Sequence, residues 1–327
     1  MQYRALGRQG PTVSALGFGA MTLAPGIYAD VDEQQAADAL LAALDAGITF
    51  IDTADIYGAG HSESLIGRVL RGRRDEFTLA TKFGGNQDER GLLVPGLGRP
   101  EYVRTALDAS LGRLRTDHVD LYYLHRLDPT TPVEETMGAL AELVEAGKVG
   151  HVGLSEVSAR TLRLACAVHP VTAVQSEYSL FSRAPEQEVL PACEELGVGF
   201  VAYSPLGRGI LGGTIRGRGE LASGDWRRGN PRFQEGNLDR NVALADAVAA
   251  LAAEHDLSAA QLALAWLMHQ GAVPIPGSRR AGNVRANAAA ADVTLAKEVV
   301  SRLEELVPPG AAAGEQGNEA YMANIDE

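Results

Sequence analysis

The sequence contains little cysteine and fewer basic than acidic residues. Its only cysteines, Cys166 and Cys193, are not in a CxxC pair, which argues against a disulfide framework and against a zinc site. Since 29 Lys and Arg stand against 42 Asp and Glu, the formal charge is -13. This charge disfavours nucleic acid and anionic lipid as main ligands, and it also disfavours anionic substrates. The expected partner is a small molecule.

Long apolar runs are also missing. The N-terminus lacks the roughly 7 to 15 apolar residues of a signal peptide, and no segment has about 18 apolar residues in succession. We therefore expect a cytoplasmic protein that does not bind membranes. No linker, repeat or low-complexity block divides the 327 residues, of which 46% are hydrophobic. We predict one domain over residues 1–327, with a mobile tail from about residue 306 to 327.

Short apolar runs alternate with longer amphipathic ones after an opening stretch that predicts a β-hairpin. The helical pattern DEQQAADALLAALDAG begins on an aspartate suited to capping and stops at Gly47, and Pro100 opens another. Eight strand-helix units in one chain predict an α/β fold of the (β/α)8 TIM barrel type. The predicted strands cover 15–19, 48–52, 77–82, 119–125, 149–155, 172–176, 199–204 and 272–277.

A long aperiodic segment, 206–240, follows the seventh strand and interrupts this alternation. Loops of such length in compact domains are usually functional. The segment contains GRGILG, a formal G-x-G-x-x-G match, but it lacks the opening strand and helix of a dinucleotide-binding unit. We interpret it as a phosphate-contacting loop that folds over bound cofactor. Its Trp226 and Phe233 either line the substrate space, with Tyr28 and Met21, or pin the loop to the barrel.

Polar residues occupy the last turn of several predicted strands. They are Asp52, Lys82, His125, Ser155, Gln175 and Tyr203. In a barrel these strand ends share one face, which is where active sites of this fold are built. Each residue alone has a structural explanation, such as a helix cap or a core histidine. A lysine and an aspartate on neighbouring strands in a desolvated barrel mouth, however, need to be paired.

Tyr57, five residues beyond Asp52, is the candidate proton donor. A lysine ammonium beside a phenol lowers its pKa from about 10, and Asp52 would hold Lys82 charged. His125 could hydrogen-bond a substrate oxygen. This set is suited to protonating a carbonyl oxygen while hydride reaches the carbon, and because no side chain supplies hydride, a nicotinamide cofactor is required.

The sequence resembles the aldo-keto reductases over nearly its whole length. The resemblance is carried by GFGAM, FIDTADIYG, TK, DLYYLHRLDP, VGLSE, VQSEYSL, AYSPLGRGILGG, PIPGS and NVRAN. It implies reduction of aldehydes and ketones with NADPH, with Asp52, Tyr57, Lys82 and His125 as the catalytic residues. It also implies a cofactor site formed by Gly19, Met21, Asp52, Ser155, Gln175, Tyr203, Ser204, Leu206, Arg208, Gly277, Ser278, Arg279 and Asn287. No metal site and no particular oligomeric state are predicted.

Two residues depart from the family pattern. Glu156 stands where many members have asparagine beside the serine that binds the nicotinamide carboxamide. Gly277 stands where some members have lysine, so that Arg279 or Arg280 would hold the 2'-phosphate of NADPH. Two alternative functions are a regulatory subunit of the channel-associated β type and an aldolase-like barrel that uses Lys82 as a Schiff-base nucleophile.

Overall fold

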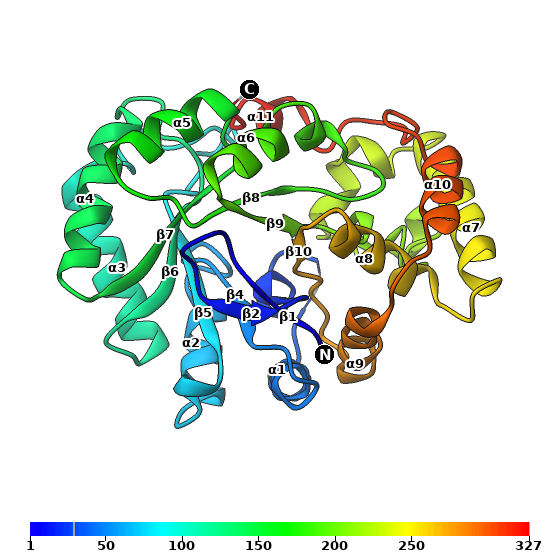
Figure 1. Cartoon of the computed structure of the whole chain (residues 1–327), viewed down its shortest axis with the longest axis horizontal. Helices are drawn as coiled ribbons and strands as arrows, with labels where there is room; N and C mark the ends of the chain where they lie inside the picture. Colours follow the sequence, from blue (N-terminus) through cyan, green and yellow to red (C-terminus); the bar gives the residue numbers. More distant parts are fainter. Residues whose placement is uncertain (29, 327) are drawn as a thin grey trace.

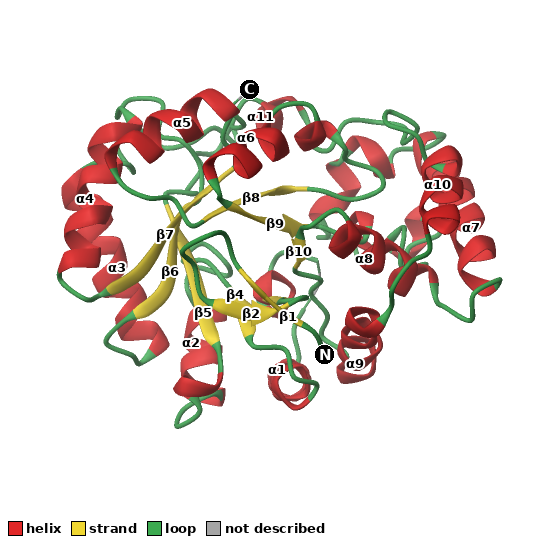
Figure 2. Cartoon of the chain, viewed as in Figure 1, coloured by secondary structure: helices red, strands yellow, loops and turns green. Residues whose placement is uncertain are grey.

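An eight-stranded parallel sheet curls into the barrel in the computed structural model, which describes residues 1–28 and 30–326 (Figures 1 and 2). The order β3-β4-β5-β6-β7-β8-β9-β10 follows the chain, and the Gly17 amide donates to the Pro274 carbonyl at 2.9 Å where the two ends of the sheet meet. All eight predicted strands are confirmed. They are β3 (Phe18–Gly19), β4 (Phe50–Asp52), β5 (Thr78–Phe83), β6 (Val119–Leu124), β7 (Val149–Ser155), β8 (Ala173–Glu177), β9 (Gly199–Tyr203) and β10 (Val273–Pro274).

Helices cover the outside of the strands (Figure 2). The predicted capping residues have the expected roles: the Asp32 side chain accepts from the Gln35 amide at the start of α1, and Pro100 is the first residue of α3. The helices are α1 (Glu33–Asp45), α2 (His61–Val69), α3 (Pro100–Leu114), α4 (Val133–Glu145), α5 (Ala159–Val168), α6 (Val189–Leu196), α7 (Asn237–Ala253), α8 (Ala259–His269), α9 (Ala281–Ala288), α10 (Lys297–Leu306) and α11 (Glu319–Met322).

The predicted N-terminal hairpin is formed by β1 (Tyr3–Ala5) and β2 (Thr12–Ser14), which pair antiparallel. Leu6 and Val13 of this hairpin belong to the apolar cluster inside the barrel. The hairpin thus fills one end of the barrel, and the catalytic candidates lie toward the other end.

Alternation along each strand separates the barrel interior from the outer layer. Phe50, Ala80 and Leu121 belong to the inner cluster, whereas Ile51 and Leu79 belong to the outer one that packs against the helices. Successive strand residues point to opposite faces, so every second residue continues the inner row. Asp52, Lys82, Ser155, Gln175 and Tyr203 are the polar continuations of these inner rows at the strands' C-terminal ends.

The segment after β9 contains four short 3-10 helices and ends at Gly236, because α7 begins at Asn237; the predicted boundary at residue 240 is therefore too late. Phe233 in this segment is fully buried. Its ring is part of the outer apolar cluster, which fixes the segment to the body of the protein. For Phe233 the structure thus favours the pinning role over a position in the substrate space.

The chain after α10 runs back across the end of the barrel and finishes near α5 and α6 (Figure 1). The Asn324 side chain donates to the Gly91 carbonyl at 2.7 Å, and the Asp326 carboxylate accepts from the Ser158 amide at 2.9 Å. Of the predicted tail from about residue 306 to 327, Leu306 still belongs to α10, and the segment from 307 to 326 contacts loops that follow β5 and β7. Residue 327 of that prediction lies outside the described part.

None of the helices in the described part of the chain combines the length and the apolar character that crossing a membrane requires.

Candidate active site

Asp52 and Lys82 form a fully buried ion pair at the ends of β4 and β5. The Lys82 ammonium lies 2.5 Å from Asp52 Oδ1 and donates to the Thr53 carbonyl at 2.8 Å. The Gln175 amide on β8 donates to Asp52 Oδ2 at 2.8 Å. Burial opposes the charge on Lys82, but the Asp52 carboxylate and Tyr57 more than offset it, and the pKa of Lys82 lies above its usual value. Lys82 is therefore a protonated, oriented cation.

Tyr57 lies in the turn between β4 and α2. Gly58 and Gly60 both have positive φ, 61° and 87°, a backbone conformation that side chains other than glycine adopt at a cost. This turn brings the phenol back over the strand ends, with the Lys82 ammonium 5.2 Å from the centre of its ring. The two residues are thus neighbours, as predicted.

The expected direction of the Tyr57 pKa is wrong for this structure. Burial raises the pKa of the Tyr57 hydroxyl above its ordinary value, and the Lys82 ammonium acts in the opposite direction without overcoming it. The cause is that desolvation disfavours the phenolate, and the prediction omitted this contribution. Tyr57 is therefore protonated and able to donate a proton, with Lys82 limiting the cost of the charge that remains.

His125 follows β6, and its ring lies nearly perpendicular to that of Tyr57, at 86°, with 5.9 Å between the ring centres. Its Nδ1 atom is buried and has no hydrogen-bond partner in the described part of the protein. Burial, followed by the charges of Arg126 and Lys82, holds the pKa of His125 well below its usual value. The imidazole is therefore neutral at physiological pH, and each ring nitrogen can serve either as donor or as acceptor.

Ser155 and Tyr203 occupy the ends of β7 and β9, as predicted. The Ser155 hydroxyl is buried and lies 3.3 Å from an Arg126 nitrogen, and Tyr203 is partly exposed at the barrel mouth. Glu156 is the departure from the family pattern, and its carboxylate accepts a hydrogen bond from the Glu177 amide at 2.8 Å. Its carboxylate therefore braces the end of β8.

Backbone strain is concentrated beside these strand ends. Glu156, Ser204 and Arg208 are non-glycine residues with positive φ, between 50° and 55°. Such conformations cost free energy and gather at functional sites. The adjoining Leu206 precedes the short 3-10 helix that contains Arg208. The two loops that follow β7 and β9 are thus held in unusual conformations by their surroundings.

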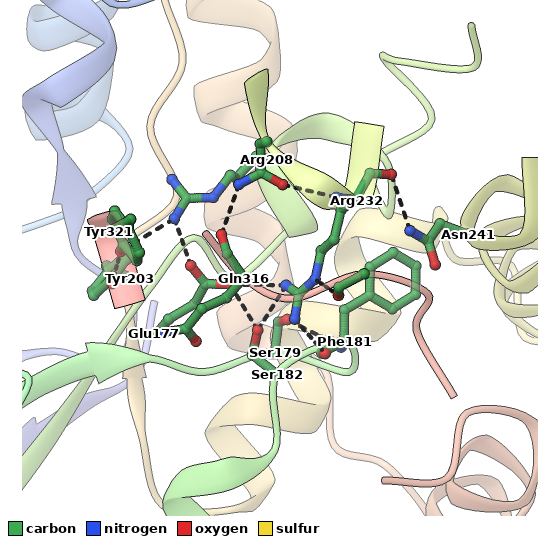
Figure 3. A network of polar contacts seen from close by, with 12 residues as sticks. Glu177, Ser179, Phe181, Ser182, Tyr203, Arg208, Arg232, Asn241, Gln316 and Tyr321 are labelled. Carbon is green, nitrogen blue, oxygen red and sulfur yellow. Dashed lines mark hydrogen bonds and ion pairs between the residues drawn. The ribbon is translucent and has the colours of Figure 1, made fainter. Parts of the chain in front are cut away.

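A buried carboxylate, Glu177, holds two arginines of the loop that follows β9 (Figure 3). Its oxygens lie 2.6 Å from Arg208 and 2.9 Å from Arg232, and the Ser182 hydroxyl donates to it at 2.7 Å. The Arg208 guanidinium also lies 4.6 Å from the centre of the Trp226 ring. This network positions Arg208, one of the predicted cofactor residues, at the barrel mouth.

The remaining predicted cofactor residues lie along β3, β10 and α9. A Cβ atom on Gly277 would come within 2.4 Å of the Gly19 carbonyl oxygen, so a lysine does not fit there without displacing the backbone. Arg279 donates to the Asp30 carbonyl at 2.8 Å. Ser278 accepts from the Arg280 amide at 3.1 Å, beside the first turn of α9, and Asn287 is buried within that helix. Within this group, Gly19 of β3 pairs with Asp52 of β4, which joins the group to the catalytic four.

Trp226 reaches the loop that follows β3. Its ring stacks on Tyr28 with 6.3 Å between ring centres, and the Arg227 guanidinium lies 4.1 Å from the centre of the Tyr28 ring. Met21, in the short helix after β3, is partly buried. The segment that follows β9 and the loop that follows β3 thus lie against each other at the barrel mouth.

Comparison with known proteins agrees with this geometry. The sequence model of the aldo/keto reductase family matches residues 15–308. The chain is 46% identical to a probable aldo-keto reductase 1 of Glycine max over 315 residues, which cover 94% of this chain and 90% of that protein. The chain belongs to the aldo/keto reductase family.

Solved structures support the same assignment. A glycerol dehydrogenase, AKR11B4 of Gluconobacter oxydans, superposes with a TM-score of 0.82 at 29% identity over 93% of this chain and 94% of that one. The holo form of the aldo-keto reductase AKR11C1 of Bacillus halodurans gives a TM-score of 0.77 at 31% identity over 98% and 100%. This aldo/keto reductase is thus an oxidoreductase of a family that acts on carbonyl compounds with nicotinamide cofactors.

Sequence reasoning missed three residues of this aldo/keto reductase site. Arg126 directly follows His125 in the quoted LHRLD motif, and Glu177 lies in VQSEYSL, so their positions at strand ends were visible in the sequence. Tyr321 comes from the C-terminal segment and lies beside Tyr203 and Arg208 (Figure 3). That segment has no periodicity, so no sequence signal placed it at the barrel mouth.

Proposed function

We propose that this enzyme reduces aldehydes and ketones to alcohols with NADPH, and that Tyr57 supplies the proton. The observation that carries the proposal is the convergence of a protonated lysine, a neutral histidine and a partly buried phenol at the ends of three neighbouring elements. Tyr57 and His125 would hold the substrate's carbonyl oxygen between them. The pairing of these groups matches the needs of general acid catalysis on a carbonyl.

The lining of the barrel mouth fits a nicotinamide cofactor. Ser155 and Gln175 offer a buried hydroxyl and a buried amide, and the Tyr203 ring offers a flat surface beside them. The bound nicotinamide supplies the hydride that reaches the carbonyl carbon. We propose that Ser155 and Gln175 hold its carboxamide, with the Gln175 oxygen available because its nitrogen donates to Asp52.

NADPH is the proposed cofactor because α9 begins beside two arginines. Neither Arg279 nor Arg280 forms an ion pair with a carboxylate of the described residues. Arginine binds phosphate through planar paired hydrogen bonds, and the N-terminus of a helix adds backbone donors. A 2'-phosphate would therefore find cationic partners here, while the Gly277 backbone leaves no room for a lysine.

Asp52, Lys82 and His125 have separate roles in the proposed proton transfer from Tyr57. Asp52 holds Lys82 charged through a 2.5 Å contact, and Lys82 reduces the free energy needed to place negative charge on the Tyr57 oxygen. His125 stays neutral, so it orients the substrate oxygen without adding charge. Asp52 and Lys82 are fully buried, and Tyr57 is partly buried above them, so water has little access to the ion pair.

The same ion pair argues against an aldolase-like use of Lys82. A Schiff base requires an unprotonated amine, and the Asp52 carboxylate raises the pKa of Lys82. Borohydride treatment in the presence of a carbonyl compound, followed by mass analysis, is expected to leave Lys82 unlabelled.

The test of the proposed function is steady-state turnover of a panel of neutral aryl and alkyl aldehydes with NADPH and with NADH. We expect turnover of several aldehydes and a lower KM for NADPH. A protein that exchanges cofactor slowly and reduces none of these aldehydes would be a regulatory subunit instead. We treat residues 1–327 as a single catalytic domain, so the whole chain is used in this assay.

A further inference from the structure

Four arginines gather at the barrel mouth, and one of them differs from the other three. Arg208 and Arg232 share the Glu177 carboxylate, and Arg227 lies 2.6 Å from Asp225. Arg126 forms no ion pair with any carboxylate among the described residues, although it is only 9% exposed. A buried guanidinium without an anionic partner is costly, so this exception calls for a physical explanation.

The contacts of Arg126 are all neutral. One terminal nitrogen donates to the His125 carbonyl at 2.8 Å and lies 3.3 Å from the Ser155 hydroxyl, and the other lies 3.5 Å from the Tyr321 hydroxyl. The guanidinium carbon stands 5.7 Å from the centre of the Tyr321 ring. These contacts orient the side chain but leave its charge without a counter-ion.

Glu156 is the carboxylate that acts on Arg126 through space, but it does not pair with it. Its Oε1 atom accepts from the Glu177 amide at 2.8 Å, and the side chain forms no ion pair with Arg126 in the described part of the chain. Arg126 therefore contributes a positive charge to the site, although the protein as a whole carries a formal charge of -13.

The position of Arg126 relates its charge to the reacting carbonyl. It is adjacent in sequence to His125, and its charge acts on both His125 and Tyr57. Under the proposed function, a carbonyl oxygen held by Tyr57 and His125 leaves the neighbouring carbon of the substrate directed along the barrel mouth. A carboxylate on that carbon is the group that a buried guanidinium recognises best, through two parallel charge-assisted hydrogen bonds.

We propose that Arg126 is a substrate-binding residue that selects 2-oxo acids, through a pair formed between its guanidinium and the substrate carboxylate. This inference rests on the proposed function. In the reaction, the keto carbon gains a hydride with two electrons from the reduced nicotinamide, the C=O π bond breaks, and the oxygen takes a proton from Tyr57, which regains it from water. The product is a 2-hydroxy acid, and the carboxylate is unchanged.

The local charge thus opposes the expectation from net charge that anionic substrates are disfavoured. A formal charge of -13 spread over the surface slows the approach of an anion, and salt screens this effect. A buried guanidinium acts at contact distance, where screening is weak. We therefore expect the contact to determine the preference among bound substrates.

The test uses phenylglyoxylate and its methyl ester, which carry the same ketone and differ in the charge of the neighbouring group. Wild-type enzyme is expected to show kcat/KM at least about 10-fold higher for the acid, and Arg126→Gln is expected to lower the acid value by about 10²-fold and the ester value by less than about 5-fold. Arg126→Lys keeps the charge but loses the paired donors, so its kcat/KM for the acid should lie between the values of the wild-type and Arg126→Gln enzymes. Arg74→Gln, which breaks an ion pair with Asp120 at the opposite end of the barrel, is the matched control and should leave the acid-to-ester ratio unchanged.

A binding measurement separates substrate recognition from positioning of the site. Oxamate, a carboxylate that is not reduced, is titrated by calorimetry into the enzyme with NADP⁺, and its dissociation constant is expected to rise at least about 10-fold in Arg126→Gln. NADPH affinity should stay within about 2-fold. Equal losses for acid and ester, or a weakened NADPH complex with an unchanged acid-to-ester ratio, would overturn the inference and make Arg126 a brace for His125 and Ser155.

The same assays distinguish failure of this inference from failure of the proposed function. If wild-type enzyme reduces neutral aldehydes and the methyl ester but gains nothing from the carboxylate, the carbonyl reductase stands and the role of Arg126 is wrong. If it reduces neither ester nor aldehydes with either cofactor, the proposed function itself fails.

Discussion

The hydroxyl groups of Tyr203 and Tyr321 lie 2.6 Å apart, a hydrogen bond that spans 118 residues of sequence. It ties the C-terminal helix α11 to the end of β9, and the Arg126 guanidinium packs on the Tyr321 ring. The C-terminal segment thus forms part of the wall of the site. A segment without periodicity in its sequence is placed there by a few polar contacts.

Removing one of these contacts should loosen the segment. Tyr321→Phe deletes the hydrogen bond to Tyr203, which is worth about 1 kcal/mol, together with the longer contacts of the hydroxyl to Arg126 and Arg208. It preserves the ring beside Arg126. We expect faster amide hydrogen exchange in residues 315–326 and little change in global stability. The control is Tyr3→Phe, which removes an exposed hydroxyl that donates to the Gly47 carbonyl at 3.4 Å, at the opposite end of the barrel. Equal exchange rates in the wild-type and Tyr321→Phe proteins would show that other contacts hold the segment.

Loss of the Tyr57 hydroxyl should separate chemistry from binding. Tyr57→Phe keeps the ring beside Lys82 and His125 but removes the proton donor, so kcat for an aldehyde should fall by about 10²-fold or more. Fold and NADPH affinity should remain as in wild type, measured by circular dichroism and by quenching of protein fluorescence. Near-normal turnover would show that another group donates the proton.

The Asp52–Lys82 pair predicts an order of severity. Lys82→Met removes the charge that lowers the free energy of the Tyr57 phenolate, and it leaves Asp52 as an unpaired buried carboxylate. We expect losses in kcat comparable to those of Tyr57→Phe, whereas Asp52→Asn should be milder because the lysine remains. The measurement is kcat of the Lys82→Met and Asp52→Asn proteins, at a temperature at which melting curves show both to be fully folded. A more severe loss in Asp52→Asn would indicate that Asp52, rather than Lys82, tunes the phenol.

The strands and the catalytic candidates could be predicted because the short apolar runs of the strands and the longer amphipathic runs of the helices were both clear. Residues such as Phe50 and Ala80 alternate with outward-facing ones, so the next inward positions, Asp52 and Lys82, could be assigned to the same face from the sequence. Tyr57 could be assigned as their neighbour because it lies only five residues beyond Asp52. These features are local, and local features are readable in a sequence.

Features that depend on distant contacts could not be predicted in this way. The charge state of Tyr57 depends on how completely its surroundings exclude water, and this is set by the packed structure. The partners of Glu177 lie 31 and 55 residues away in an aperiodic loop. The place of Tyr321 at the barrel mouth likewise depends on where the C-terminal segment folds.

Cofactor preference should depend on the arginines beside α9. Arg279→Ala and Arg280→Ala each remove a possible partner of a 2'-phosphate, and we expect at least one of them to weaken NADPH binding by about 10-fold or more while changing NADH binding little. Dissociation constants for both cofactors are measured by fluorescence titration. Arg285→Ala, on the same helix, is the matched control. If neither of the first two variants alters NADPH affinity, the preference for NADPH loses its basis.

A carboxylate beside the catalytic residues should make stability depend on pH. The Asp55 amide donates to the Lys82 carbonyl at 3.1 Å. The Asp55 Oδ1 atom is buried and has no hydrogen-bond partner among the described residues. Burial and then the nearby Glu63 carboxylate raise the pKa of Asp55 from 3.8 to about 7. Glu63 itself is neutralised by Arg113 at 2.6 Å, so it contributes less than burial.

The direction of the effect follows from where the proton is held. The folded protein keeps the proton on Asp55 up to about pH 7, whereas the unfolded chain releases it near pH 3.8. Stability from this group is therefore fully present below pH 3.8, declines as pH rises between these two values, and is lost above pH 7. Asp55→Asn removes the cost of ionising a buried group, so its melting temperature should exceed that of wild type by about 2 °C or more at pH 8, with the difference shrinking toward pH 4. Scanning calorimetry of both proteins from pH 4 to 8.5 measures the difference directly. An offset that is constant with pH would mean that Asp55 stays ionised in the folded protein and that its environment is more polar than its burial indicates.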